Sequence, residues 1–416
     1  MIPEISNRGH NMPASPIRKL ASLADAAKQR GTHVHYLNIG QPDLETPEAI
    51  RRELAAIEDK VLCYSPSPGT PDFLAWMCEY YASAGISISV ENVIATTGGS
   101  EAIIFAMMAC ADEGEEILVV EPFYTNYAAF AAMSGLRLVP VTSRGRDGFH
   151  LPSPAVWERA LTPETRMVLL CNPNNPTGTV YSKDELMQVA EFCRRHDLFL
   201  VSDEVYREFV YDGRKAMSAL ELEGFEGLVI VVDSLSKRFS ACGIRLGSLI
   251  SRNGAIIKAC MKMAQARLSA SGIAQRIALG ARNLPPDYTQ TVISEYQMRR
   301  DILFEGLRSM PGVFLTRPEG AFYCVARLPV RDSDDFAEWL LRDFQHEGAT
   351  ILLAPAAGFY ATPGLGMNEV RIAYVLDEKA LRNALDVLRA GLAEYRSLRG
   401  LGEDELFDAP SAAHRS

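Results

Sequence analysis

The sequence contains no apolar run long enough to cross a membrane. No stretch approaches about 18 continuous apolar residues, the length that a spanning helix requires. Residues 1–18 carry prolines and charged side chains instead of an apolar segment, so we expect no signal peptide. The sequence therefore predicts a protein without a membrane partner.

Basic clusters and a nicotinamide-binding fingerprint are also missing. The net charge is −10 at pH 7, and no long block of Lys and Arg interrupts it. This charge argues against a nucleic-acid partner. No Gly-x-Gly-x-x-Gly motif follows an apolar run, which disfavours a nicotinamide-dependent Rossmann enzyme.

Cysteine is scarce and scattered. Eight cysteines occur in 416 residues, none in a Cys-x-x-Cys pair, and most stand in apolar segments. This distribution is typical of reduced core residues in a cytoplasmic protein and not of a disulfide framework. We therefore expect a cytoplasmic location and no metal site.

Alternating strands and helices are what the chain does contain. Short apolar runs and helical patterns alternate between residues 93 and 234, which predicts an α/β fold with a mostly parallel sheet sandwiched by helices. After residue 247 the pattern becomes helical, and residues 312–398 read as a smaller α+β domain. We expect four regions: an N-terminal arm with part of the small domain at 1–45, a large domain at 46–300, a small domain at 301–400 and a flexible tail at 401–416.

The most informative stretch is residues 234–247. It follows an apolar run and contains Ser234, Ser236, Lys237 and Arg245. Two hydroxyls and a guanidinium can hold a phosphate, and a lysine beside them can form a Schiff base with an aldehyde. A phosphate and an aldehyde describe pyridoxal 5′-phosphate (PLP). For the Ser-x-Ser-Lys pattern alone, a surface loop is the competing interpretation.

Glycine and aromatic motifs stand near other predicted strands. Gly99 and Ser100 open a predicted helix with exposed backbone N–H groups, a common anion site. Tyr124 follows the strand at residues 116–120, where an aromatic ring can stack on a flat ligand or simply pack. Gly40 allows a ligand to approach the backbone, although a plain turn explains it equally well.

Polar side chains follow two further predicted strands. Asn175, in the loop 172–178, can donate to an oxygen on the PLP ring, and Tyr206 can bond the ring hydroxyl. Asp203 can keep the ring nitrogen protonated, which PLP needs to act as an electron sink. Each residue also has a structural alternative: a double turn for Asn175, core packing for Tyr206 and a helix cap for Asp203. Because parallel strands end at one edge of a sheet, we expect these side chains to converge.

Taken in order, the motifs resemble those of the class I and II aminotransferases, which are PLP-dependent enzymes of fold type I. The resemblance extends over residues 16–398. Seven segments carry it: Asn-Ile-Gly-Gln-Pro-Asp at 38–43, Gly-Gly-Ser at 98–100, Pro-Phe-Tyr at 122–124, Asn-Pro-Asn-Asn-Pro-Thr-Gly at 172–178, Asp-Glu-Val-Tyr at 203–206, Ser-Leu-Ser-Lys at 234–237 and Val-Arg-Ile-Ala at 370–373.

The resemblance implies a role for each cofactor residue. Lys237 forms the Schiff base with PLP and then moves the proton between the substrate Cα and the cofactor. Asp203 pairs with the ring nitrogen, and Tyr124 stacks on the ring. Asn175 and Tyr206 bind the ring oxygen. The phosphate is held by hydroxyls, a guanidinium and backbone amides, which belong to Ser234, Ser236, Arg245, Gly99, Ser100 and Glu101.

The resemblance also implies the substrates and a partner subunit. Arg371 clamps the substrate α-carboxylate, and Asn175 and the Gly40 backbone complete the clamp. Tyr64 resembles the tyrosine that reaches the phosphate of the neighbouring subunit, which implies a homodimer with shared active sites. The reaction is a ping-pong transamination from an L-amino acid, with aspartate or an aromatic amino acid as the expected donor, to a 2-oxo acid such as 2-oxoglutarate.

Side-chain specificity and the exact reaction stay open at this point. Some aspartate-using relatives carry a basic residue after the Gly-Gly pair, where this chain has Ser100 and Glu101. Arg18 and Arg267 are spare cations that can meet a distal carboxylate or serve as ordinary structural arginines. A PLP-dependent lyase or synthase would carry the same residues. A transcription regulator with an aminotransferase-like domain is disfavoured, because the chain is acidic and residues 1–37 are too few for a winged helix.

Overall fold

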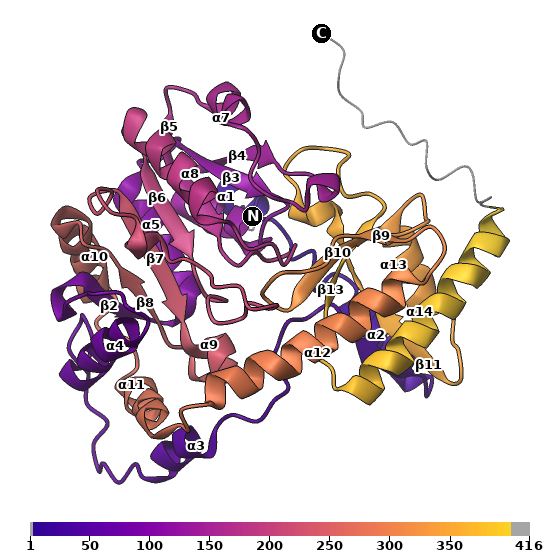
Figure 1. Cartoon of the computed structure of the whole chain (residues 1–416), viewed down its shortest axis with the longest axis horizontal. Coiled ribbons are helices and arrows are strands. Elements are labelled where there is room, and N and C mark those ends of the chain that lie inside the picture. Colours follow the sequence, from indigo (N-terminus) through magenta and orange to yellow (C-terminus); the bar gives the residue numbers. More distant parts are fainter. Residues whose placement is uncertain (1–2, 401–416) are drawn as a thin grey trace. The chain divides into compact units, whose positions relative to one another are not determined.

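Two compact units make up the described part of the chain. The computed structural model describes residues 3–400 (Figure 1). Within them, unit 1 comprises residues 3–13, 41–295 and 319–321, and unit 2 comprises residues 14–40, 296–318 and 322–400.

A seven-stranded sheet forms the centre of unit 1. The strand order is β2-β8-β7-β6-β5-β3-β4. All neighbouring strands are parallel except where β8 pairs with β2 and β7. This arrangement confirms the predicted α/β fold with a mostly parallel sheet. The bounds are β2 (Val93–Thr96), β3 (Glu116–Glu121), β4 (Arg137–Thr142), β5 (Thr165–Cys171), β6 (Phe199–Asp203), β7 (Val229–Ser234) and β8 (Gly247–Ile250).

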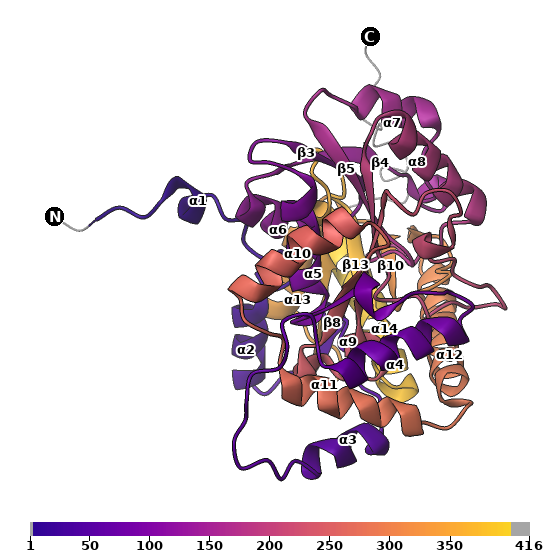
Figure 2. The same ribbon diagram turned by 90° about the vertical axis from the view of Figure 1, so that its left-hand side faces the viewer.

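Helices cover both faces of this sheet. α5 (Gly98–Cys110) packs on β7 and β8, α10 (Gly254–Ala266) packs on α5, and α8 (Lys183–Arg195) packs on β6. Figure 2 shows α5 and α10 on one side of the sheet and α8 on the other. Because both faces are covered, β2, β3 and β7 are buried at every position, which explains why their central residues are apolar.

The remaining helices of unit 1 are short or lie at its edges. α8 begins at the predicted capping box, in which Ser182 and Glu185 each bond the other's backbone N–H. The other helices are α1 (Asn7–His10), α3 (Glu48–Ala55), α4 (Pro71–Ser83), α6 (Asn126–Ser134), α7 (Pro154–Ala160), α9 (Leu235–Arg238), α11 (Gly272–Ala278) and the first part of α12 (Tyr288–Arg308).

Unit 2 combines two small sheets with helices, as predicted for the smaller α+β domain. An antiparallel sheet has the order β12-β13-β10-β9, and β1 pairs with β11 in parallel. The elements are α2 (Ala21–Gln29), β1 (His33–Tyr36), the rest of α12, β9 (Phe314–Leu315), β10 (Tyr323–Arg327), α13 (Ser333–Arg342), β11 (Ala349–Leu352), β12 (Ala354–Pro355), β13 (Glu369–Ala373) and α14 (Glu378–Arg399).

Two negative findings apply to residues 3–400. No helix there is long and apolar enough to cross a membrane. No group of three or more His, Cys, Asp or Glu side chains in that range is placed to hold a metal ion.

Candidate active site

The N-terminus of α5 forms an anion cradle with Arg245. Gly98 has a φ of +75°, and a Cβ there would lie 2.6 Å from Nη2 of Arg245. Glycine therefore lets the guanidinium approach the first turn of the helix, where backbone N–H groups lack helical partners. The carboxylate of Glu101 accepts from the Thr97 N–H at 2.8 Å, so its side chain caps this turn.

Strand β8 brings the cradle to the end of β7. A Cβ on Gly247 would lie 2.6 Å from the carbonyl oxygen of Asp233 and 2.8 Å from the backbone nitrogen of Gly99. The backbones of β7, β8 and α5 therefore touch at this glycine. The hydroxyls of Ser234 and Ser236, both buried, lie 3.0 Å apart at the same end of β7.

Lys237 follows these hydroxyls within α9. Its Nζ lies 3.8 Å from Sγ of Cys242, and that thiol donates to the carbonyl of Ser236 at 3.3 Å. Burial raises the pKa of the Asp203 carboxyl, and the positive charge of Lys237 offsets part of that rise. Lys237 and Asp203, predicted from separate motifs, therefore interact electrostatically in the folded chain.

Asp203 ends β6, between β5 and β7 in the sheet. It is buried, and its carboxylate accepts from the Tyr127 hydroxyl at 2.7 Å and from the Val205 N–H at 3.3 Å. Burial is the main influence, and it raises the pKa of Asp203 to about 6. A buried carboxylate of this kind gains stability from a cationic partner such as a protonated ring nitrogen.

The other ring-binding candidates also stand at strand ends. Asn175 is buried in the loop after β5, and Tyr206 is buried in the turn after β6. Tyr124 follows β3; its ring meets the Tyr127 ring edge-on, with centroids 5.4 Å apart. Tyr127 is a residue that the sequence analysis missed, although it stands only three positions after Tyr124.

In unit 2, Arg371 is a buried cation between aromatic rings. It lies on β13, 4.6 Å from the Tyr323 ring centroid and 5.0 Å from that of Phe359, and it donates to the carbonyl of Asn38. A Cβ on Gly40 would lie 1.8 Å from Oη of Tyr323. Glycine is therefore required where the backbone passes this ring. A guanidinium buried in this way suits bidentate carboxylate binding.

Tyr64, Arg18 and Arg267 are the remaining residues from the sequence analysis. Tyr64 is 81% exposed, and Arg18 is exposed at the surface of unit 2. Arg267 lies 3.6 Å from the carboxylate of Glu101 and donates to the carbonyl of Ala95 at 2.7 Å. The structure thus gives Arg267 partners within its own unit.

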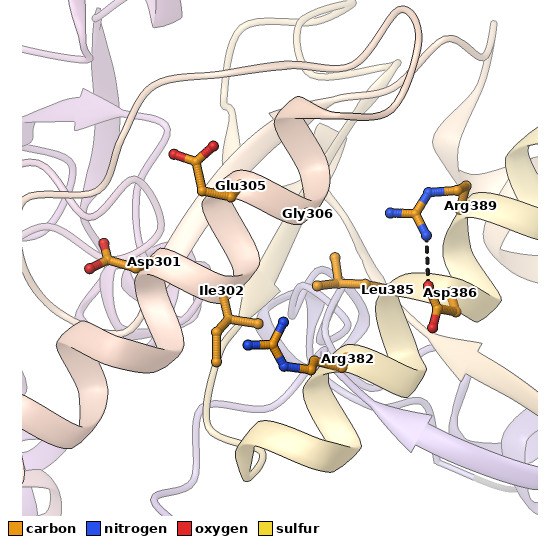
Figure 3. A pocket seen from close by; sticks show the side chains of 8 residues that line it. All are labelled: Asp301, Ile302, Glu305, Gly306, Arg382, Leu385, Asp386 and Arg389. Carbon is orange, nitrogen blue, oxygen red and sulfur yellow. Dashed lines mark hydrogen bonds and ion pairs between the residues drawn. The ribbon is translucent and has the colours of Figure 1, made fainter.

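A separate groove in unit 2 carries charged side chains (Figure 3). It has a volume of about 460 Å³ and lies between α12 and α14. Arg382 and Arg389 line it, but they pair with Glu378 and Asp386 of their own helix at 2.9 and 2.6 Å. We assign no ligand to this groove, which contains none of the predicted site residues.

The residues of unit 1 fit PLP. A phosphate suits the cradle of N–H groups, hydroxyls and guanidinium, where a Cβ at position 98 would collide with Arg245. A ring nitrogen suits the buried carboxylate of Asp203. Lys237 supplies the amine that an aldehyde needs.

Comparisons with known proteins agree with this fit. The family model described as aminotransferase class I and II matches residues 32–388. Aspartate/prephenate aminotransferase of Thermus thermophilus is 30% identical over 392 residues, which cover 92% of this chain and 97% of the relative. Aromatic-amino-acid aminotransferase 2 of Thermococcus litoralis is 30% identical over 94% of this chain and 99% of its own.

The solved structures lead to the same family. The structure of aspartate aminotransferase from Thermus thermophilus with maleate superimposes with a TM-score of 0.85 at 29% identity, covering 94% of this chain and all of that one. These findings support transamination and give no support to the lyase, synthase or regulator interpretations. The chain belongs to the class I and II aminotransferase family and is a PLP-dependent amino acid aminotransferase.

Proposed function

We propose that Lys237 is the base that holds and moves the proton at the substrate Cα, and that Asp203 and Tyr206 control the charge of the cofactor ring. PLP supplies the electron sink when it is bound. Asp203 keeps a proton on the ring nitrogen, and Asn175 and Tyr206 bind the ring oxygen. The observation that carries the proposal is the placement of Lys237 and the buried Asp203 directly after or at the ends of two neighbouring parallel strands, β7 and β6.

The phosphate and the ring face are assigned to residues around the cradle. Gly99, Ser100 and Glu101 offer their backbone N–H groups. Tyr124 stacks on the ring, since it follows β3 beside Tyr127. The hydroxyls and the guanidinium that complete the phosphate site come from Ser234, Ser236 and Arg245.

The substrates are small amino and 2-oxo acids. Arg371 binds the α-carboxylate, and Asn175 and the Gly40 backbone support it; burial of Arg371 between two rings favours this role. Relatives named for aspartate, prephenate and aromatic amino acids support an aspartate or aromatic donor. We propose a ping-pong reaction with 2-oxoglutarate as the acceptor.

A half-reaction screen tests the donor directly. Single L-amino acids are added to the PLP-loaded protein without an oxo acid, while the visible spectrum is followed and the product is identified by mass. We expect stoichiometric conversion by one or two donors, with release of the matching 2-oxo acid. Release of ammonia or a changed carbon skeleton would contradict transamination.

Lys237→Ala tests the assignment of the base. This variant should bind PLP yet lose nearly all turnover, because alanine lacks the amine that moves the proton at the substrate Cα. Turnover close to that of the wild type would remove Lys237 from its proposed role.

We propose a homodimer in which Tyr64 completes the site of the neighbouring subunit. Val61, Leu62 and Tyr64 are 72%, 64% and 81% exposed, an apolar stretch that a second copy would cover. Mixed dimers of Lys237→Ala and Tyr64→Ala subunits test the sharing. If sites are shared, one of the two sites in the mixed dimer is intact, so activity should exceed that of either parent.

The domain division and the location remain proposals as well. We propose an N-terminal arm with part of the small domain at residues 1–45, a large domain at 46–300 and a small domain at 301–400. The compact units support this division, since residues 46–295 lie in unit 1 and residues 14–40 and 322–400 lie in unit 2. The proposed tail at 401–416 lies outside the described residues. The eight cysteines are free thiols, which supports a reducing, cytoplasmic location.

A further inference from the structure

A buried ionic network lies next to Lys237 in unit 1. We call it the Arg238 network, and it has five members. Arg238 belongs to α9 and Asp233 to β7, while three members stand in the turn after β6: Glu204, Arg207 and Glu208. Their side chains are between 1 and 13% exposed.

Each member contacts another of opposite charge. The guanidinium of Arg238 pairs with Asp233 and lies 3.5 Å from the carboxylate of Glu208. Arg207 lies 3.5 Å from Glu208 and 3.9 Å from Glu204. The network is therefore continuous from the turn after β6 to the helix that carries Lys237.

Aromatic residues of α4 and α12 enclose the network. Arg238 lies 4.3 Å from the Tyr80 ring centroid, and Arg207 lies 4.3 Å from that of Tyr81. The Tyr81 hydroxyl donates to Asp233 at 3.0 Å, and the Tyr288 hydroxyl donates to the carbonyl of Arg238 at 3.1 Å.

Stability alone is a weak explanation for this network. Well-packed apolar residues in place of a buried ion pair are often neutral or stabilising, because they avoid the desolvation of two charges. The position of its members indicates another purpose. Glu204 follows Asp203, and the Ser234 N–H donates to Asp233 at 2.7 Å. Arg238 is bonded directly to Lys237 through the backbone.

We propose that Arg238 is a positioning residue for Lys237, acting through its buried network with Asp233 and Glu208. α9 has only four residues, and a helix that short does not hold its own conformation. The Arg238–Asp233 pair closes the turn from β7 into α9, and so fixes Ser234, Ser236 and Lys237 relative to β6 and Asp203. The inference rests on the proposed role of Lys237.

The charge of the network is also coupled to the site. Three carboxyl groups face two guanidinium groups, so full ionisation leaves one excess negative charge. Burial raises the pKa of Glu204 and that of Glu208 to about 7, and the charge of Asp233 raises the pKa of Asp203. A change in the network should therefore move the pH profile of the reaction.

Arg238→Met is the first test, measured on the PLP-loaded enzyme. We expect kcat to fall about 100-fold, the cost of displacing a reacting group by about 1 Å, with little change in KM. The visible circular dichroism of bound PLP should weaken, and the PLP dissociation constant should rise. Arg238→Lys should partly restore kcat, the circular dichroism and the PLP affinity, since lysine keeps the positive charge but lacks the planar set of donors of a guanidinium. Arg195→Met is the matched control, because Arg195 pairs with Glu158 on the surface.

A double variant separates positioning from stability. Arg238→Met with Glu208→Gln removes one positive and one negative charge, so the melting temperature should recover relative to Arg238→Met. Positioning predicts that kcat, circular dichroism and the pH profile stay altered. Recovery of all three together with the melting temperature would overturn the inference.

Lys237→Ala, measured in parallel, separates this inference from the proposed function. If Lys237→Ala keeps its turnover, the role of Lys237 fails. If Lys237→Ala is inactive while Arg238→Met matches the Arg195→Met control in every readout, only the positioning role fails.

Discussion

Replacing Asp203 with asparagine should stabilise the cofactor-free protein while it removes most of the activity of the loaded enzyme. Asp203 is buried, and burial raises the pKa of its carboxyl from the ordinary 3.8 to about 6. Ionising it in the folded protein therefore costs about 3 kcal/mol, at about 1.4 kcal/mol for each pKa unit. This cost is absent below about pH 4, where the carboxyl is protonated in both states, and is complete above about pH 6.

An asparagine at this position carries no charge and avoids the cost. The Tyr127 hydroxyl and the Val205 N–H meet different oxygens of the carboxylate. Because the amide keeps only one of these oxygens, one hydrogen bond is lost, which reduces the gain by about 1 kcal/mol. A net gain of about 2 kcal/mol above pH 6 should raise the melting temperature of the cofactor-free protein by a few degrees.

Thermal unfolding of cofactor-free wild type and Asp203→Asn at pH 4.5 and pH 8 measures this gain. The difference should be larger at pH 8. Asp203→Glu is the control, because it keeps the charge and should show no such gain. In the loaded enzyme Asp203→Asn should lower kcat about 100-fold or more, since an amide does not hold a proton on the ring nitrogen. Equal melting temperatures at pH 8 would refute the reasoning about burial.

Three other predictions follow from single contacts. Gly247→Ala should destabilise the protein by about 1–3 kcal/mol and weaken PLP binding, because the added Cβ would lie 2.6 to 2.8 Å from backbone atoms. Gly254→Ala is the control, because its Cβ would have no neighbour within 4 Å, and it should leave PLP binding unchanged. His150→Gln should lower the melting temperature at pH 7, because the hydrogen bond to Glu185 raises the pKa of His150 to about 10. The difference in melting temperature between variant and wild type should vanish as the pH rises through about 10. A difference that persists above that pH would count against this role of His150. Arg371→Ala should raise KM for every amino and oxo acid alike, while an effect on one substrate only would place Arg371 near the side chain.

Local sequence patterns predicted the sheet of unit 1 and the polar residues at its edge. Buried strands such as β2 (Val93–Thr96) and β7 (Val229–Ser234) begin with apolar residues and end in polar ones, so their ends are visible in the sequence. β8 was missed because Gly247–Ile250 is only four residues long and precedes a strongly helical pattern.

Contacts between distant residues could not be predicted in the same way. Tyr127 and Asp203 are 76 residues apart, and the hydrogen bond between them depends on how β3, β5 and β6 are ordered in the sheet. Arg238 looks like a surface cation beside Lys237 in the sequence. The structure buries it because α4 supplies Tyr80 and Tyr81 from more than 150 residues earlier in the chain.

The antiparallel strand β8 has a consequence for how the protein is made. It is the strand that joins β2, which leads into the Gly98 turn, to β7, which ends in Ser234. At the ribosome, β2 emerges long before its partner, because Val93 pairs with Ile250. At roughly 5–20 residues per second the gap lasts roughly 8–30 s. During that interval the proposed phosphate site is incomplete and the edge of β2 is unpaired, so we expect PLP to bind only after β8 has been synthesised.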